Sequence, residues 1–342
     1  MQIQIDSNIL NHVASKILSK TITHTTHTSR QLQGGTVGDV QLLSGTAHTA
    51  DGEALPFHVV LKTQKKWERW RDPNSWRREY DFYKLDLSEA FSSAFRRPEC
   101  YDAEFSEEGT RLWMEYIQGV SGDDLTVPMM EKAAYELGLF QGRLHAQPSC
   151  LAGAANMRDV NARETHFRHW KPKNLEYSYI RSADCPIPKH LRDMIIDIDS
   201  RADDIFQRIR KLPVVLYHGD YWTENIIYAN DTIAALDWDT AGWGYLGEDI
   251  VSLITDETNP ALWAEYKAKL IPAYFKGISA YMDIDSSAME AAISDMILTD
   301  SYNNVCYYMR SLAENDEESF EDAEYHLNEL EMRYEVFYKA AH

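Results

Sequence analysis

The most informative stretch of the chain runs Leu216-Tyr217-His218-Gly219-Asp220-Tyr221-Trp222-Thr223-Glu224-Asn225, followed by Ala235-Leu236-Asp237-Trp238-Asp239. An apolar run over 214–217 ends at His-Gly-Asp, and two more apolar runs, 226–228 and 233–236, are joined through Asn230-Asp231. Short apolar runs joined by Asn and Asp are typical of a β-hairpin. Asn225 would open its first strand and Asp237 would close its second. We therefore expect these two side chains to lie close together, with Asp220 on the loop just upstream.

This set of oxygen-bearing side chains suits phosphoryl transfer. That reaction needs a carboxylate to orient or deprotonate the acceptor hydroxyl, and hard oxygen ligands for Mg²⁺. We predict that Asp220 takes the first role and that Asn225 and Asp237 take the second. Each residue alone would be an ordinary turn residue or strand terminator, but their joint spacing favours the functional interpretation.

The pattern His-Gly-Asp-x₄-Asn with a downstream Asp-Trp-Asp resembles the aminoglycoside phosphotransferase and choline kinase superfamily, the small-molecule relatives of protein kinases. His-Gly-Asp stands where protein kinases carry His-Arg-Asp, and Asp237 stands where they carry the Asp of Asp-Phe-Gly. The resemblance implies an α+β, bilobal, protein-kinase-like fold. A small β-rich nucleotide lobe would cover 1–117, and a larger, mostly helical lobe for catalysis and acceptor binding would cover 118–342. It also implies ATP and Mg²⁺ as cofactors.

Lys62 resembles the lysine by which kinases bind the nucleotide phosphates, although a lysine at a strand end can also be an ordinary exposed edge residue. Alternation over 57–62 predicts a strand that ends at this lysine. In the helix predicted next, Glu79 falls on the apolar stripe formed with Trp76, Tyr80 and Tyr83. A carboxylate there costs free energy unless it is paired, so we expect an ion pair with Lys62, for which Arg77 and Arg78 would compete.

Three further positions are nucleotide-site candidates by their place in the resembling family. Gly35 belongs to a glycine cluster over 34–38 between predicted strands, which fits either a hairpin over the ATP phosphates or a plain flexible turn. Glu115 and Ile117 lie in a predicted strand over 112–117, where the family has the hinge that holds adenine through main-chain groups. These three are therefore predicted to bind the cofactor.

Other polar residues of the motif region are assigned structural or open roles. Asp249 resembles a family aspartate that ties its helix back to the catalytic loop, and His218 is expected to support that loop. Asp239 would contact metal or acceptor, or cap the turn before Gly242. His166 and His169 stand three residues apart, but nothing near them in the sequence completes a metal site.

Composition narrows the class of protein. The chain has 342 residues, of which 44% are hydrophobic and 12% aromatic, which excludes a largely disordered protein. Its four cysteines are scattered, which argues against a disulfide scaffold or a zinc site. No apolar run approaches the ~20 residues of a membrane span, and no secretory signal is visible. A cytoplasmic enzyme without membrane contact is expected.

Charge narrows the partners. Asp plus Glu number 54 against 34 Lys plus Arg, so nucleic-acid binding is not expected. Residues 281–342 hold 15 acidic and three basic side chains, whereas 62–84 hold eight basic and four acidic ones. This asymmetry fits nucleotide phosphates on one side and a cationic acceptor on the other, although an acidic helix face also serves solubility.

Three functional hypotheses follow. The first is a kinase for the hydroxyl of an amine-bearing small molecule, such as an aminoglycoside or a choline-like alcohol. The second is a kinase for a neutral or anionic alcohol such as homoserine or a sugar, and the third is a non-catalytic nucleotide-binding regulator. Retention of Asp220, Asn225, Asp237, Lys62 and Glu79 argues against the third. The oligomeric state is expected to be a monomer or a homodimer.

Overall fold

The computed structural model describes residues 5–32, 38–67, 72–170, 180–314 and 317–339. The described chain packs into two compact units, each built from more than one segment. The first contains residues 1–120, 150–157 and 227–241, and the second contains the remainder. The division at 117/118 into a nucleotide-binding lobe and a catalytic lobe stays a prediction.

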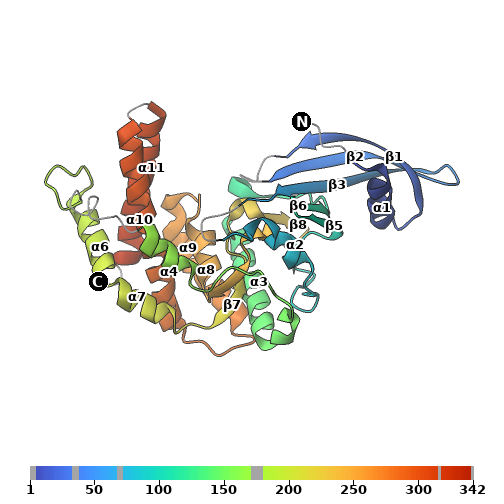
Figure 1. Ribbon diagram of the computed structural model, residues 1–342. Coiled ribbons are helices and arrows are strands. Elements are labelled where there is room, and N and C mark those ends of the chain that lie inside the picture. The colour runs from blue at the N-terminus through green and yellow to red at the C-terminus, as the bar shows by residue number, and fades with distance from the viewer. Residues whose placement is uncertain (1–4, 33–37, 68–71, 171–179, 315–316, 340–342) are drawn as a thin grey trace. The chain divides into compact units, whose positions relative to one another are not determined.

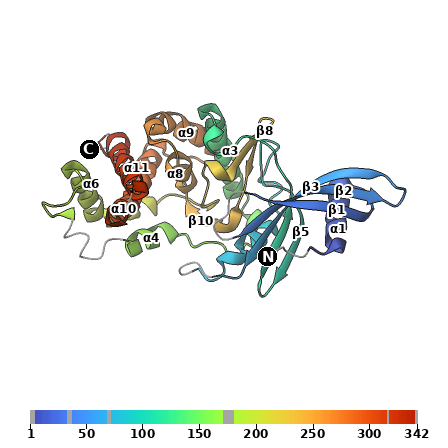
Figure 2. The same cartoon turned by 90° about the horizontal axis from the view of Figure 1, so that it is seen from above.

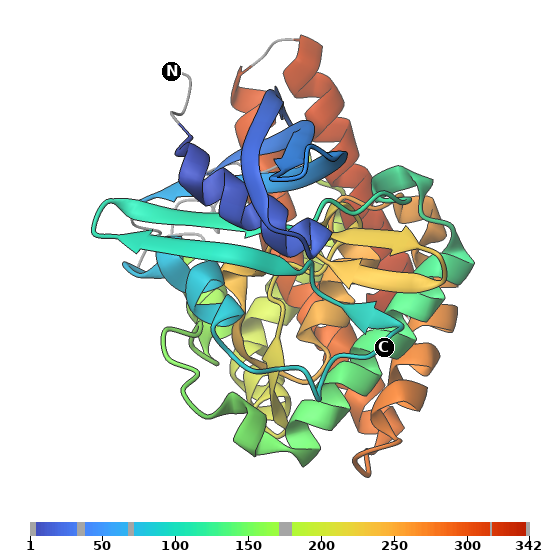
Figure 3. The same cartoon turned by 90° about the vertical axis from the view of Figure 1, so that its right-hand side faces the viewer.

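A five-stranded antiparallel sheet forms most of the first unit. In spatial order its strands are β1 (Ile22–Gln31), β2 (Asp39–Thr49), β3 (Ala54–Lys65), β6 (Gly109–Met114) and β5 (Cys100–Ser106). Helix α1 (Ser7–Leu18) covers one face, where its Leu10 and Val13 join the apolar core made with Phe57, Val59 and Trp113. Figure 3 shows α1, in dark blue, against these strands. The strand predicted from the alternation over 57–62 is part of β3, which continues past Lys62 to Lys65.

The other face of the sheet packs on helix α2. A 3₁₀ turn (Ser75–Arg77) leads into α2 (Arg78–Tyr83), so the helix itself is shorter than the sequence pattern indicated. Tyr80 and Tyr83 of α2 contact a second apolar cluster that includes Leu42 and Leu112. The position of α2 is therefore fixed by the sheet that carries Lys62.

A smaller three-stranded sheet contains the predicted hairpin. Its order is β4 (Phe95–Arg96), β9 (Thr232–Ala235) and β8 (Ile226–Ala229). Asn230 and Asp231 both adopt left-handed backbone conformations, with φ of 50° and 63°. Two consecutive residues with positive φ make the tight turn that matches the twist of a hairpin, which confirms the hairpin prediction.

The second unit is mostly helical (Figure 1). Its helices are α3 (Val127–Ala146), α4 (Ala162–Trp170), α6 (Lys189–Ser200), α7 (Ala202–Ile209), α8 (Glu248–Thr255), α9 (Trp263–Ile278), α10 (Ser286–Glu314) and α11 (Glu317–Arg333), continued by a π-helical turn (Tyr334–Tyr338). Short 3₁₀ turns lie at Gly122–Asp124, Pro148–Leu151, Thr223–Asn225 and Pro260–Leu262.

Helices α3 and α9 lie side by side in this unit (Figure 2). Their contact is close because Gly138 of α3 faces the main chain of α9: a Cβ added there would lie 2.4 Å from the carbonyl oxygen of Tyr274. No helix of the described ranges is both long and apolar enough to cross a membrane.

A two-stranded antiparallel sheet supports the His-Gly-Asp loop. β7 (Val214–Tyr217) pairs with β10 (Gly242–Tyr245), and Gly244 lies over the ring of Tyr217, where any side chain would collide with it. Leu216 and Tyr217 are buried. The chain leaves β7 at His218, so the loop with Asp220 starts from a rigid, buried strand end.

Candidate active site

Lys62 lies between two carboxylates in the first unit. Its Nζ is 2.6 Å from Oε2 of Glu79 and 2.7 Å from Oδ1 of Asp237. The side chains of Lys62 and Glu79 are only 8% and 5% exposed. The predicted Lys62–Glu79 ion pair is therefore present, and Arg77 and Arg78 pair instead with Asp81 and Asp72. Binding of nucleotide phosphates by Lys62 stays a prediction.

The electrostatics of this triad favour a charged lysine. Burial disfavours the ammonium, but the attraction of Asp237 and Glu79 outweighs it and raises the pKa of Lys62 above its ordinary value. Burial also raises the pKa of Glu79, and Lys62 offsets only part of that effect. Lys62 should therefore stay protonated, because two carboxylates stabilise its charge. The charged form of Glu79 should depend on Lys62, because burial alone would favour the neutral acid.

Asp237 has an unusual backbone conformation. Its φ of 56° and ψ of 67° place it in the left-handed region, which residues other than glycine adopt only at a cost in free energy. The next residue, Trp238, is fully buried: its main-chain N–H donates to Glu79 (3.3 Å), its indole N–H donates to the carbonyl of Ala235 (2.9 Å), and its ring stacks on Phe82 at 4.3 Å. The backbone around Asp237 is thus held on both sides of a strained residue.

Asp220 and Asn225 contact each other in the second unit. The amide nitrogen of Asn225 donates to the main-chain oxygen of Asp220 and to its Oδ2, both at 2.9 Å. These two bonds commit the nitrogen end of the amide, so the oxygen of Asn225 is the atom suited to a metal. The structure thus brings Asp220 and Asn225 together, as expected. Their convergence with Asp237, which belongs to the other unit, stays a prediction.

Asp249 anchors the His-Gly-Asp loop. One carboxylate oxygen accepts the main-chain N–H of Gly219 (2.8 Å), and the other accepts the N–H of His218 (2.9 Å). The second oxygen also accepts the side-chain amide of Gln141 on α3 (2.8 Å). Tyr274 continues this buried network by donating to the oxygen of Gln141. Burial raises the pKa of Asp249 to about 7 although the two loop N–H groups act against it. The predicted tie between this helix and the catalytic loop is present.

The predicted hinge residues lie just after strand β6, which ends at Met114, three residues before the strand end we expected. The carboxylate of Glu115 pairs with Arg96 and accepts the main-chain N–H of Glu99 (3.2 Å). Its side chain therefore orders this corner, and any role of Glu115 and Ile117 with adenine rests on main-chain atoms. Gly35 lies outside the described residues.

The remaining candidates have structural surroundings. Asp239 is 8% exposed, and its main-chain oxygen accepts from Arg78 (3.1 Å). Burial, the largest influence, lowers the pKa of His166. Within the described ranges, no group of three or more His, Cys, Asp and Glu side chains is arranged to hold a metal ion.

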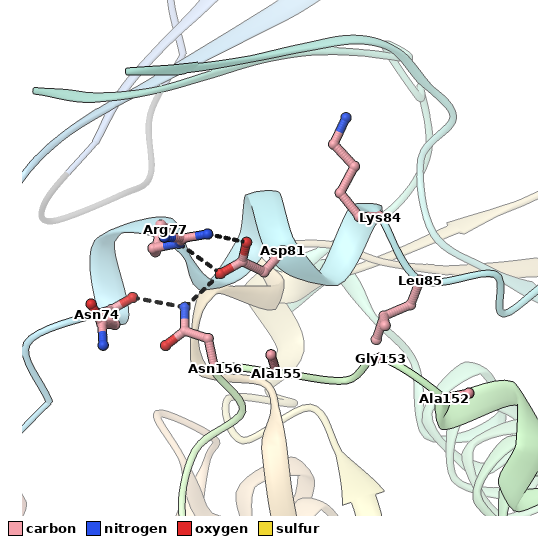
Figure 4. Close-up of a pocket in the computed structure, with 9 residues that line it drawn as sticks. All are labelled: Asn74, Arg77, Asp81, Lys84, Leu85, Ala152, Gly153, Ala155 and Asn156. Carbon is pink, nitrogen blue, oxygen red and sulfur yellow. Dashed lines mark hydrogen bonds and ion pairs between the residues drawn. The ribbon is translucent and has the colours of Figure 1, made fainter. Parts of the chain in front are cut away.

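A cavity of about 360 Å³ lies on the outer side of α2 (Figure 4). It is lined by α2 and by the 150–157 segment, through Asn74, Arg77, Asp81, Lys84, Leu85, Ala152, Gly153, Ala155 and Asn156. Most of its polar side chains bond to one another: Arg77 pairs with Asp81, which also accepts from Asn156 (2.7 Å). The polar groups around the cavity therefore hold α2 against the 150–157 segment.

Sequence reasoning missed two buried polar residues of the site. The sequence indicates Arg78 only as a competitor for Glu79, and it gives no role to Gln141. Arg78 lies among polar residues such as Asn74, Ser75 and Asp81, so its place in the sequence gives no signal. Gln141 stands between Leu137 and Leu144 on an otherwise apolar helix stripe, and such a buried polar side chain needs a partner. That signal marks a residue for attention but does not identify the partner.

The chain matches a family model described as "Phosphotransferase enzyme family" (APH) over residues 65–283. A search of curated proteins finds no significant match. Several solved structures share the fold at low identity. An aminoglycoside phosphotransferase, APH(2")-IIa, in complex with gentamicin is 19% identical, with 97% of this chain and 99% of that chain covered and a TM-score of 0.52.

Two other similar structures are kinases by their names. Choline kinase from Cryptosporidium parvum is 14% identical, with 92% and 91% coverage and a TM-score of 0.54. The amicoumacin kinase hAmiN, in complex with AMP-PNP and Ca²⁺, is 16% identical, with 96% and 93% coverage and a TM-score of 0.52. These similarities establish a mixed α+β, protein-kinase-like fold. Since the family model spans well over half of the sequence, the chain belongs to the APH phosphotransferase enzyme family and is a small-molecule kinase.

Proposed function

We propose that this kinase transfers the γ-phosphoryl group of ATP to a hydroxyl of a small, amine-bearing molecule. The observation that carries the proposal is the buried Lys62, held jointly by Glu79 and Asp237. A lysine fixed in this way presents one permanent positive charge, which is what a nucleotide phosphate requires. Membership of the phosphotransferase family supplies the reaction class.

In this proposal the site residues divide the work of binding and transfer. Asp220 accepts the hydrogen of the acceptor hydroxyl, and Asn225 keeps its carboxylate oriented through the two amide hydrogen bonds. Lys62 holds the nucleotide phosphates, and Glu79 keeps Lys62 in place. Main-chain groups near Glu115 and Ile117 would hold adenine, and the segment with Gly35 would cover the phosphates.

The donor atoms fit Mg²⁺. Asn225 offers an amide oxygen and Asp237 a carboxylate that is 29% exposed, both hard oxygen ligands of the type that Mg²⁺ prefers. Mg²⁺ would neutralise negative charge on the transferred group. The similar amicoumacin kinase hAmiN is itself in complex with a divalent ion, Ca²⁺, and with AMP-PNP.

The charge distribution favours an amine-bearing acceptor. Residues 281–342 carry 15 acidic and three basic side chains, so a cationic acceptor would be attracted to this part of the chain. The gentamicin complex and the choline kinase among the similar structures concern aminated compounds in those proteins. The second candidate is a kinase for a neutral or anionic alcohol, which the same catalytic residues would serve equally well.

We also place the enzyme in the cytoplasm, because its four cysteines, all within the described ranges, form no disulfide. Its partner would be the small acceptor alone, and it would act as a monomer or a homodimer.

The test is a measurement of ADP release stimulated by acceptors. Wild-type protein with Mg·ATP would be screened against amines, amino acids and sugars, each amine being paired with its deaminated counterpart. We expect an amine-bearing alcohol to stimulate release. The neutral-alcohol candidate is supported instead if the deaminated partner is the better acceptor.

Asp220→Ala separates transfer from binding. This variant should retain Mg·ATP affinity in calorimetry but lose stimulated ADP release by at least about 100-fold, as expected for a lost general base. Asp184→Ala, which removes an exposed carboxylate of the same unit, is the matched control. Near-normal transfer by Asp220→Ala would refute the role of Asp220.

A further inference from the structure

Arg78 is the most deeply buried cation among the described residues of the first unit, with 2% of its surface exposed. Its guanidinium binds three separate segments of the chain. One nitrogen donates to both carboxylate oxygens of Asp72 at 2.7 Å, Nε donates to the carbonyl of Asn156 at 2.9 Å, and the third nitrogen donates to the carbonyl of Asp239 at 3.1 Å. Only a planar, multiply donating cation can make all these bonds at once.

The bond to Asp239 acts on the backbone of the proposed metal ligand. Asp237 stands two residues upstream in a left-handed conformation, which persists only where the surrounding structure enforces it. Two consecutive residues of α2 provide that enforcement: Glu79 accepts the N–H of Trp238, and Arg78 donates to the carbonyl of Asp239. Residues 237–240 are therefore held through two main-chain groups, the N–H of Trp238 and the carbonyl of Asp239.

The second acceptor of Arg78 is fixed to the same helix. Asn156 has φ of 61°, and its side-chain amide donates to the carbonyl of Asn74 (3.1 Å) and to the carboxylate of Asp81 (2.7 Å). Figure 4 shows this amide between the two acceptors. The carbonyl that Arg78 binds is thus presented by a segment anchored to α2, so α2, residues 150–157 and residues 237–240 form one hydrogen-bonded assembly.

We propose that Arg78 is a positioning residue for the metal site. It holds the main chain of residues 237–240 so that the Asp237 carboxylate keeps the orientation that Mg²⁺ binding needs. This inference rests on the proposed function only for the role of Asp237 as a metal ligand. Arg78 itself contacts neither nucleotide nor acceptor in this account.

Arg78→Lys is the main test variant because it keeps the charge, but its single nitrogen cannot reach the three segments that the three nitrogens of the guanidinium bind. It should raise the Mg²⁺ concentration for half-maximal rate about ten-fold and lower kcat, the range found when residues that orient metal ligands are changed. The KM for the acceptor should stay within about two-fold. A purely structural role would instead lower the amount of folded protein without shifting the Mg²⁺ dependence.

The matched control is Arg77→Lys. Arg77 is the neighbouring arginine, 36% exposed, and it pairs with Asp81, one turn further along the chain. It should leave the Mg²⁺ dependence unchanged. Asn156→Gly is a second variant in case Arg78→Lys folds poorly: it tolerates the positive φ and keeps the carbonyl, but removes the anchoring amide. It should shift the Mg²⁺ dependence in the same direction, by about two- to three-fold.

Hydrogen exchange provides a readout independent of turnover. The amides of Trp238 and Ala241 should exchange faster in Arg78→Lys than in wild type, while amides of α1 stay unchanged. If wild type shows no transfer but this exchange difference occurs, the proposed function fails and only the hold of Arg78 on the main chain of residues 237–240 stands. If wild type transfers phosphate and Arg78→Lys changes neither exchange nor Mg²⁺ dependence, the positioning role is refuted.

Discussion

The carboxylate of Asp237 lies 2.7 Å from the ammonium of Lys62, although 175 residues separate them in the sequence. Lys62 is on a central strand of the large sheet, and Asp237 follows the last strand of the small one. The contact therefore joins the two sheets of the first unit through a charge pair. Lys62 also pairs with a second carboxylate, that of Glu79, whose Oε2 lies 2.6 Å from the lysine Nζ.

This arrangement predicts that removing the lysine destabilises the protein more than neutralising Glu79 does. Lys62→Met would leave the buried Glu79 carboxylate without its counter-charge and should destabilise the protein by about 3–5 kcal/mol. Glu79→Gln should cost clearly less, because Lys62 keeps Asp237 and because burial already raises the pKa of Glu79 toward its neutral form. Thermal and denaturant unfolding would measure both.

The control for Lys62→Met is Lys20→Met. Lys20 also pairs with a glutamate, Glu53, but both side chains are 44% exposed, so the loss should stay within about 1 kcal/mol. In a double-mutant cycle on nucleotide affinity, Lys62 and Glu79 should couple. Additivity within about 0.5 kcal/mol would contradict the pairing as a functional unit.

A second prediction concerns the backbone of Asp237. Asp237→Gly and Asp237→Ala should both abolish transfer, since each removes the proposed metal ligand. They should differ in stability: glycine accepts the left-handed conformation freely, whereas alanine pays about 1 kcal/mol for it. Unfolding experiments should therefore find Asp237→Gly the more stable of the two. Equal stability would mean that the backbone relaxes once the carboxylate is gone.

Much of the site could be predicted because its signals are local in the sequence. Asn230 and Asp231 are the residues that a tight hairpin turn requires, so the hairpin follows from a short stretch of sequence. The pairing of Glu79 could be inferred because a carboxylate on an apolar helix stripe must find a cation. The role of Asp249 followed from resemblance, and the hydrogen bonds to the His-Gly-Asp loop give it a physical cause.

Other features could not be predicted because their cause lies in distant segments. Strand β1 is an edge strand that is exposed along nearly its whole length, so it shows no apolar alternation. The partners of Arg78 come from residues 72, 156 and 239, and only the folded chain brings them together. Nothing in the spacing of these residues marks them as neighbours.

A third prediction concerns the pH dependence of the catalytic loop. The carboxylate of Asp249 accepts three N–H groups, and protonation of one oxygen would replace an acceptor by a donor. Because burial raises the pKa of Asp249 to about 7, kcat should rise as pH increases toward 8. Asp249→Asn places an NH₂ group against these donors, and it should lower kcat by about 100-fold or more.

Stability should follow the opposite trend. A carboxyl group whose pKa is raised on folding binds more protons in the folded state between its unfolded pKa, near 4, and its folded pKa, about 7. Its contribution to stability is therefore full below pH 4 and is lost as pH rises through 7. The free energy of unfolding of wild type relative to Asp249→Asn should fall over this range. A difference that is constant with pH would contradict the raised pKa.

A fourth prediction contrasts two glycines of helix α3. A Cβ at Gly138 would lie 2.4 Å from the carbonyl oxygen of Tyr274, a main-chain atom of α9, so even alanine must push the two helices apart. A Cβ at Gly142 would come no closer than 3.0 Å, and the nearest atoms are the ring and Cβ of Tyr281, a half-exposed residue that needs to shift by only a few tenths of an ångström. Alanine also favours the helix over glycine by about 1 kcal/mol at either position.

Gly138→Ala should therefore destabilise the protein by about 1–3 kcal/mol, the cost of overpacking a close contact. Gly142→Ala should be neutral or slightly stabilising. Both variants make the same chemical change in the same helix, so differential scanning calorimetry on the pair isolates the contact with α9. Because Gln141, which bonds to Asp249, lies between the two glycines, Gly138→Ala should also reduce kcat, whereas Gly142→Ala should leave it within two-fold of wild type. If both variants behaved alike, the close approach of α3 and α9 would not be what fixes the position of Gln141.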